Sequence, residues 1–209
     1  MTLWAALLEI IAPGDCLVCD LPLLGLCSAG VCVECIQRIP DTISRVSGPP
    51  SLIETVSMGP YDGALGAMVR HGKYAPKVGV FDVLGRRLGD ALMGRIDVDV
   101  VTHVPIPWMR RWRRGFDQGE RLGRSISDRT GIPYRQLVYR RHTDQQVGKG
   151  STERKALPVS AFALSAGPIP ERVLLVDDVR TTGASLHAVA RALKRGGASS
   201  IWGATLCHQ

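Results

Sequence analysis

The sequence predicts an α/β domain with a mostly parallel sheet, preceded by an N-terminal helix and a four-cysteine module. Three observations predict this fold. From Leu52 onward, short β-branched runs alternate with longer helical periods, and this alternation favours a parallel sheet that is covered on both faces. Of the 209 residues, 45% are apolar, which excludes a disordered chain and a collagen. Five of the six cysteines lie within the first 35 residues.

The most apolar stretch of the chain, residues 3–12, predicts a short N-terminal helix. It is interrupted by Glu9 and is shorter than the roughly 20 apolar residues that cross a bilayer. No Lys or Arg precedes it to form the basic flank of a secretory signal. We therefore expect a helix packed on its own protein, no membrane span and a cytoplasmic location.

The cysteines form two pairs, Cys16-x2-Cys19 and Cys32-x2-Cys35, with twelve residues between them. Two thiolate pairs on tight turns can complete a tetrahedral zinc site, so we expect a zinc-ribbon-like module with a structural metal. Disulfides are a competing interpretation that a reducing cytosol disfavours, and a redox-active pair is a weaker alternative because one pair would suffice. Cys27 either replaces one ligand or packs.

Residues 40–50 are rich in Pro, Ser and Gly and predict a linker between the N-terminal module, residues 1–39, and the main domain, residues 51–209. Within the main domain, apolar patterning and the breakers Gly131, Pro133 and Gly196 delimit the elements. The expected strands are 100–104, 172–176 and 200–206, and the expected helices are 81–93, 120–129 and 185–195. Ligands of such sheets collect at the carboxyl ends of the strands.

The excess of positive over negative charge is confined to one segment of the chain. Residues 108–155 contain 13 Lys and Arg and 5 Asp and Glu, whereas the rest of the chain contains 13 basic and 14 acidic residues. This excess implies an anionic partner, whether a polyphosphate, a nucleotide or a nucleic acid. A solvated basic surface is the alternative.

The most informative segment is residues 173–185. Four apolar residues predict a strand buried on both faces, and Asp177 and Asp178 follow at its end, where a ligand would lie. A turn of small residues then opens a helix, and its amides and hydroxyls can surround a phosphate. The turn consists of Thr181, Thr182, Gly183, Ala184 and Ser185. The segment predicts a ribose 5-phosphate site; a capped helix after a core strand, with two surface acids, is the alternative.

These thirteen residues resemble the signature with which type I phosphoribosyltransferases bind 5-phosphoribosyl 1-pyrophosphate (PRPP). Further features resemble the ComF family, also called GntX-like or competence protein F, and the resemblance covers nearly the whole chain. These features are the paired cysteines behind a helix, Lys73-Tyr74, Val104-Pro105-Ile106-Pro107, Arg114-Gly115-Phe116-Asp117-Gln118, and Thr143-x2-Gln146 with Arg154. The resemblance implies a type I phosphoribosyltransferase-like domain.

The resemblance also implies roles for single residues. Asp177 and Asp178 would bind the ribose hydroxyls, and residues 181–185 the 5-phosphate. The pyrophosphate side would be formed by Pro105, Arg114 and Gly115, with Lys73 and the segment 145–154 reaching the same anion. Mg²⁺ would neutralise the leaving oxygens. Because catalysis in this fold is mostly positioning and charge stabilisation, we nominate no general base.

Three positions depart from the pattern of the family. Asp117 replaces a usual Asn and adds negative charge near the pyrophosphate loop, while Lys149 and Leu157 replace an apolar residue and an Asn. These departures affect the pyrophosphate end of the implied site and leave the ribose end intact. The histidines His71, His103 and His142 are expected to be packed or on the surface rather than catalytic.

Two classes of function remain open. One is a PRPP-dependent phosphoribosyltransferase, acting on an unknown base or amine in DNA uptake (competence) or nucleotide metabolism. The other is a non-catalytic accessory protein that binds single-stranded DNA or a helicase or recombination partner. For DNA, Trp108, Trp112 and Phe116 lie among arginines and offer stacking surfaces, unless they pack in the core.

Overall fold

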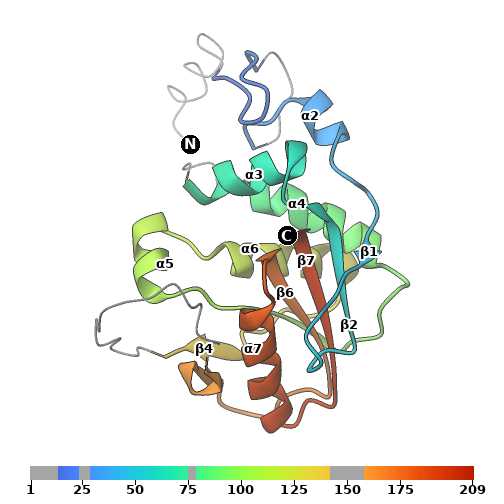
Figure 1. Cartoon of the computed structure of the whole chain (residues 1–209), viewed down its shortest axis with the longest axis vertical. Helices are drawn as coiled ribbons and strands as arrows, with labels where there is room; N and C mark the ends of the chain where they lie inside the picture. Colours follow the sequence, from blue (N-terminus) through green and yellow to red (C-terminus); the bar gives the residue numbers. More distant parts are fainter. Residues whose placement is uncertain (1–13, 24–28, 75–78, 142–157) are drawn as a thin grey trace.

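The computed structural model describes residues 14–23, 29–74, 79–141 and 158–209, and a five-stranded sheet forms its centre (Figure 1). The strand order is β1-β2-β7-β6-β3. The last four of these strands run parallel, and β1 is antiparallel to β2. The strands are β1 (Ser44–Arg45), β2 (Glu54–Pro60), β3 (Val100–His103), β6 (Arg172–Arg180) and β7 (Ser200–His208). The predicted α/β class with a mostly parallel sheet is confirmed.

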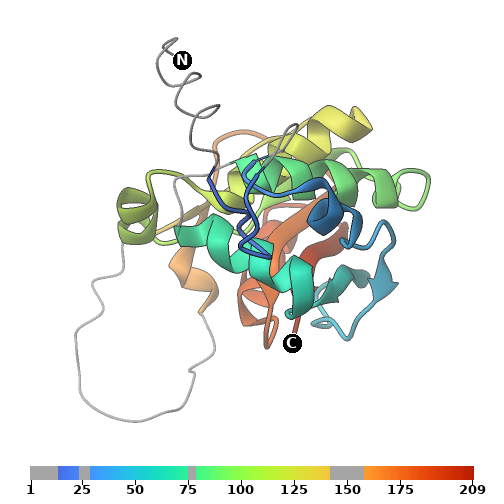
Figure 2. The same ribbon diagram turned by 90° about the horizontal axis from the view of Figure 1, so that it is seen from above.

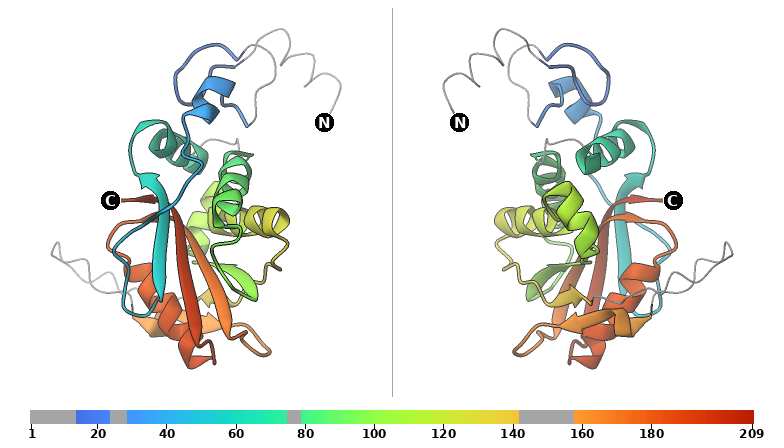
Figure 3. Two further views of the ribbon diagram at one scale, coloured as in Figure 1. Left: turned by 90° about the vertical axis from the view of Figure 1, so that its right-hand side faces the viewer. Right: turned by 90° about the vertical axis from the view of Figure 1, so that its left-hand side faces the viewer.

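Helices cover both faces of the sheet (Figure 3). Leu174 and Val176 of β6 pack on one face, whereas Val173 and Leu175 pack on the other, and all four are fully buried. This two-sided burial explains the run of consecutive apolar residues. The helices on the first face are α3 (Gly63–Tyr74), α4 (Gly79–Leu92) and α6 (Gln118–Thr130), and α7 (Ala184–Arg195) lies on the second.

Shorter elements complete the described part of the chain. A small antiparallel pair, β4 with β5, packs against α7. No helix among the described residues is both long and apolar enough to cross a bilayer. The shorter elements are α2 (Val33–Gln37), α5 (Trp108–Arg114), β4 (Val138–Arg140), the 3₁₀ helix η1 (Val159–Ala161) and β5 (Phe162–Leu164).

The predicted strands and helices of the main domain are all present, but β6 and β7 are longer than predicted. Pairing between the two strands continues beyond the apolar run, with Asp177 opposite Thr205 and Arg180 opposite His208. The two acids therefore lie within the second half of β6 and not after it. In the segment 40–50, predicted as a linker, Ser44 pairs with Ser57 of β2. The helix predicted at 3–12 lies outside the described residues.

The cysteine module shares one hydrophobic core with helices α3 and α4 (Figure 2). Cys16, Val31 and Cys35 are almost fully buried and belong to the same cluster as Met68 of α3 and Phe81 of α4. A Cβ at Gly79 would lie 2.9 Å from the Cβ of Ala29, so the module and the start of α4 are in close contact. The module is therefore part of the structure that supports this face of the sheet.

Candidate functional site

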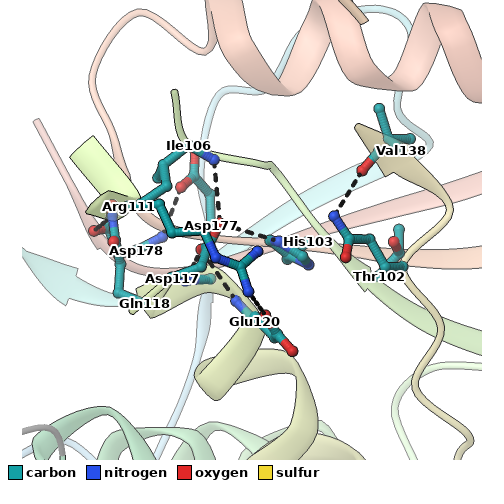
Figure 4. A network of polar contacts seen from close by, with 12 residues as sticks. Thr102, His103, Ile106, Arg111, Asp117, Gln118, Glu120, Val138, Asp177 and Asp178 are labelled. Carbon is teal, nitrogen blue, oxygen red and sulfur yellow. Dashed lines mark hydrogen bonds and ion pairs between the residues drawn. The ribbon is translucent and has the colours of Figure 1, made fainter. Parts of the chain in front are cut away.

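The site predicted from the aspartate pair lies at the carboxyl edge of the sheet, where β6 meets α3 and α6. The carboxylate of Asp178 is 8% exposed, and its Oδ2 lies 3.0 Å from Lys73 Nζ at the end of α3. The amide Nε2 of Gln118, at the start of α6, donates to the same oxygen at 3.1 Å (Figure 4). Three elements far apart in the sequence therefore converge on one buried carboxylate.

A second layer of contacts extends this cluster to α5. Arg114 Nη1 donates to Gln118 Oε1 at 3.0 Å, and the Arg114 guanidinium carbon lies 5.6 Å from the centre of the Tyr74 ring. Lys73 and Arg114, assigned from the resemblance to the pyrophosphate side, thus contact Asp178 directly or through Gln118. No role was predicted for the amide side chain of Gln118. The sequence analysis named Gln118 only as the last residue of a family motif.

Asp177 is held differently from its neighbour. Its Oδ1 accepts the backbone amide of Asp178 at 2.9 Å. Burial, followed by the adjacent charge of Asp178, raises the pKa of Asp177 well above its usual value, and the Asp178 amide and Lys73 only partly oppose this shift. A positive charge placed beside the pair would therefore favour loss of the Asp177 proton.

The turn after β6 leads directly into α7. Thr181 and Thr182 are exposed, and Thr182 Oγ1 accepts the amide of Ala184 at 3.4 Å. Gly183 has φ +74° and is the N-cap of α7, which has no side-chain cap. An added Cβ would lie 3.5 Å from Pro49 Cδ, an ordinary contact, so the left-handed backbone is what requires glycine here. The Thr182 hydroxyl thus engages the first amide at the positive end of this 12-residue helix, while the N-cap Gly183 itself offers no side chain.

The proposed pyrophosphate loop is mostly helical. Residues 108–114 form α5, and Gly115 ends this helix with φ +78°. Pro105 lies in the short connection from β3 to α5, which is tied to α6 because the amide of Ile106 donates to Asp117 Oδ2 at 3.3 Å. No helix was predicted at α5. None of its side chains is buried, so its sequence has no apolar periodicity that would indicate one.

Asp117 is buried at the start of α6 (Figure 4). Its Oδ1 accepts the amides of Gly119 and Glu120 at 2.9 and 3.3 Å. Its Oδ2 lies 3.5 Å from His103 Nε2, an ion-pair contact without hydrogen-bond geometry. Burial alone would raise the pKa of Asp117, but His103 and the backbone amides outweigh it and lower the pKa. The negative charge that Asp117 adds in place of the usual Asn is therefore stabilised by groups of the protein itself.

His103 lies between this carboxylate and the partly buried Tyr134. Its ring is fully buried, and its Nδ1 lies 2.8 Å from the hydroxyl of Tyr134. The predicted histidine His142, the departures Lys149 and Leu157, and the basic segment 145–154 lie outside the described residues, whereas His71 is exposed on α3.

The four paired cysteines form a compact cluster. The sulfurs of Cys16, Cys19, Cys32 and Cys35 all lie within 4.8 Å of one another, and those of Cys19 and Cys32 are 3.8 Å apart. A tetrahedron with bonds of about 2.3 Å to each sulfur has edges of about 3.8 Å, so the cluster fits a metal ion. Amides, led by that of Cys32, outweigh burial and lower the pKa of Cys16 to about 6. Cys27 lies outside the described residues.

Comparison with known proteins agrees with this architecture. Residues 117–209 match the phosphoribosyl transferase domain family. The chain is 30% identical over 167 residues to competence protein F of Haemophilus influenzae, covering 74% of this chain and 73% of that protein. The chain belongs to the ComF family. This ComF chain is also 28% identical to the DNA utilization protein YhgH of Salmonella typhi, over 94% of this chain and 97% of that one.

This ComF chain is also similar to two solved structures over about three fifths of its length. The allosteric regulatory enzyme of purine biosynthesis is 20% identical, with a TM-score of 0.43, over 61% of this chain and 26% of that one. A purine phosphoribosyltransferase of Pyrococcus horikoshii is 20% identical, with a TM-score of 0.37, over 62% of this chain and 72% of that one.

Proposed function

We propose that this protein binds PRPP or a related ribose 5-phosphate at the carboxyl edge of its sheet. The observation that carries the proposal is the buried Asp178, held by Lys73 and Gln118, one short turn before the start of α7, where the N-cap is a glycine. The first amides of α7 would receive the 5-phosphate. Asp177 and Asp178 would accept hydrogen bonds from the ribose hydroxyls.

Mg²⁺ fits the chemistry of this edge, because two adjacent carboxylates provide the oxygen ligands that it prefers. Burial and the adjacent charge of Asp178 raise the pKa of Asp177, so a cation beside the pair would favour the charged form of both carboxylates. Mg²⁺ would supply charge neutralisation for the pyrophosphate of the ligand. Lys73 and Arg114 would orient that anion, and transfer of the ribosyl group would then depend on an acceptor.

Calorimetry with PRPP and Mg²⁺ tests the proposal directly. We expect measurable binding to the wild type and a loss of about 100-fold or more in Asp177→Asn/Asp178→Asn, because the hydroxyl acceptors lose their charge. Asp128→Asn, an exposed acid on α6, is the control and should bind as the wild type does. Absence of PRPP binding to the folded wild type, or unchanged affinity in the double variant, overturns the proposal.

We further propose that the metal of the four-cysteine cluster is structural Zn²⁺, held by Cys16, Cys19, Cys32 and Cys35 in the cytoplasm, where thiols stay reduced. The support is the donor set, four sulfurs within 4.8 Å. Metal analysis of the purified protein should give one zinc per chain, and Cys16→Ser/Cys19→Ser should abolish it. Iron or no metal in protein purified without chelators contradicts this assignment.

The pathway we propose is DNA uptake or nucleotide metabolism, and the names of the relatives, a competence protein and a DNA utilization protein, support the first. One surface favours direct binding of single-stranded DNA as a second candidate. Helix α5 buries none of its residues and carries four arginines, while Met109 and Trp112 are 66% and 81% exposed. Phe116 packs at 6.2 Å from Phe81 and is not part of this surface. Arginines and an exposed indole are typical of strand-binding surfaces.

A salt titration of oligonucleotide binding tests this second candidate. Phosphate contacts predict affinity that falls steeply with salt, and Trp112→Ala should weaken binding by about tenfold through lost stacking. The control is Tyr139→Ala, an exposed aromatic on β4. Absence of binding at low salt would exclude single-stranded DNA as a ligand. The exposed face of α5 would then be a candidate docking surface for a helicase or recombination partner.

A further inference from the structure

The edge of the sheet that β1 and β2 form (Figure 1) contains a cavity of about 320 Å³. Its apolar lining consists of Ile43 before β1, Val56 of β2, Ile96 after α4 and Trp202 of β7. All four contribute to the hydrophobic core on the face that carries α4. Helix α4 ends at Leu92, before the cavity, and Trp202 is only partly buried. The volume is at the small end of ligand sites, which span roughly 300–1,000 Å³.

Three charged side chains complete the lining of the cavity, and two of them neutralise each other. Arg45 Nε donates to Glu54 Oε1 at 2.8 Å, and the Glu54 side chain is 16% exposed. In the described part of the chain, no carboxylate lies within ion-pair distance of the Arg95 guanidinium. Arg95 is therefore available for an anionic group of a ligand.

This cavity is separate from the proposed ribose 5-phosphate site. Trp202 lies near the start of β7 and pairs with Leu174 of β6, whereas Asp178 lies four positions further along β6. Four residues of a strand span roughly 13 Å. Glu54, which pairs with Trp202, is the first residue of β2, so the cavity lies at the amino ends of the strands. An inference from the cavity is thus independent of the function proposed for the carboxyl edge.

We infer that the cavity binds a small aromatic monocarboxylate, with its ring on Trp202 and its carboxylate on Arg95. Aromatic pairs gain energy beyond the area that they bury, and a guanidinium can form two parallel hydrogen bonds with a carboxylate. A phosphate dianion fits less well, because the carboxylate of Glu54 lines the same cavity and would repel it. A cationic ligand fits less well too, because Glu54 already pairs with Arg45.

Calorimetry on the full-length protein tests this inference with phenylacetate and its neutral analogue phenylacetamide. We expect saturable binding of phenylacetate to the wild type, about tenfold tighter than that of the amide, which forms no charge-assisted pair with Arg95. Arg95→Gln should weaken phenylacetate binding to the level of the amide. The control is Arg86→Gln, which should bind as the wild type does, since Arg86 is exposed on α4 and does not line the cavity.

Nuclear magnetic resonance of the indole N–H groups locates the bound ring. The chain has four tryptophans, and phenylacetate should shift the indole signal of Trp202 more than the other three. Loss of this signal in Trp202→Phe identifies it. Asp177→Asn/Asp178→Asn should bind phenylacetate as the wild type does, whether or not this variant binds PRPP.

Each possible result decides the inference. Absence of saturable phenylacetate binding to the folded wild type overturns it, as do equal affinities for the acid and the amide. A preference for the acid that persists in Arg95→Gln, or a larger shift at another tryptophan, places the ligand outside this cavity. Loss of phenylacetate binding in the double aspartate variant would assign the ligand to the carboxyl edge of the sheet and would equally overturn the inference.

Discussion

At the scale of single residues, Gly183 and Gly131 share one backbone conformation in different surroundings. Both have φ +74°, Gly183 before the first turn of α7 and Gly131 after the last turn of α6. An alanine at either position would adopt a left-handed conformation that costs roughly 1–2 kcal/mol. The proposed phosphate lies only at the first of the two.

We therefore predict that Gly183→Ala and Gly131→Ala lower the free energy of unfolding by similar amounts, about 1 kcal/mol, while only Gly183→Ala weakens PRPP binding, by about tenfold or more. The reason is the close approach of a phosphate to the backbone at a helix start. Urea denaturation and calorimetry on both variants check this. Equal affinities in the two variants would place the phosphate elsewhere.

The buried carboxylate of Asp117 makes stability depend on pH. Its pKa is lowered in the folded chain, where His103 and the amides outweigh burial, so the folded state binds this proton less tightly than the unfolded state. The resulting stabilisation is fully present above the unfolded pKa, about 3.9, and is lost as the pH falls through the lower folded value.

Asp117→Asn should keep an oxygen that caps α6 but lose the charge beside His103. We predict a loss of about 1–2 kcal/mol at pH 7, and a smaller difference from the wild type near pH 3, because this pH lies below the unfolded pKa, where the stabilisation by the charge is already declining. Urea denaturation at the two pH values measures both differences. A loss that is equal at pH 7 and pH 3 would show that the charge of Asp117 contributes nothing.

At the scale of elements, the ion pair between α3 and β6 joins two segments about 100 residues apart. The side chains of Lys73 and Asp178 are 15% and 8% exposed, so removal of one partner leaves a largely buried charge. We predict that Lys73→Met destabilises the fold by about 3 kcal/mol, because breaking a buried pair costs roughly 3–5 kcal/mol. Thermal or urea unfolding measures the change.

A double-mutant cycle provides the control for this prediction. Asp178→Asn removes the charge that Lys73→Met leaves behind, so the double variant should be less destabilised than the sum of the two single variants. Strict additivity would mean that the two side chains do not interact in the folded protein.

The elements that the sequence predicted are those whose burial leaves a pattern. The apolar run of β6 and the amphipathic turns of α4, α6 and α7 record which faces are covered. By contrast, β1 has two residues and β4 and β5 have three each, too few for a periodic signal, and α5 has no buried side chain to mark a face. Such elements are defined by tertiary contacts, which no local pattern contains.

The same distinction separates the two halves of the candidate site. Asp177 and Asp178 were predictable because two acids at the end of a buried strand have few structural uses. Gln118 is 60 positions away from Asp178 and neutral, so only the packing of α6 against β6 shows that it holds that carboxylate. His103 and Tyr134 likewise become partners only in the folded chain, because the segment after α6 pairs with β3 through the bridge between Val101 and Tyr134.

At the scale of the whole molecule, the cysteine cluster and the main domain unfold as one unit if their shared core is continuous. Cys16 and Cys35 contribute to the cluster of buried residues that contains Met68 and Phe81. Structural zinc sites contribute directly to folding free energy. Loss of the metal should therefore destabilise α3, which carries Lys73, and α4, which packs against α6.

We predict that chelation lowers the Tm of the whole chain in a single calorimetric transition, by at least several degrees, since a few kcal/mol shift the Tm of a chain of this size by several degrees. Cys16→Ser should lower the Tm similarly without chelator. Cys207→Ala provides the control, because Cys207 is equally buried but lies in β7, outside the cluster, and this variant should keep its zinc and its sensitivity to chelation. Two separate transitions, with the upper one unaffected by chelation, would show that the cysteine module is thermodynamically independent of the sheet.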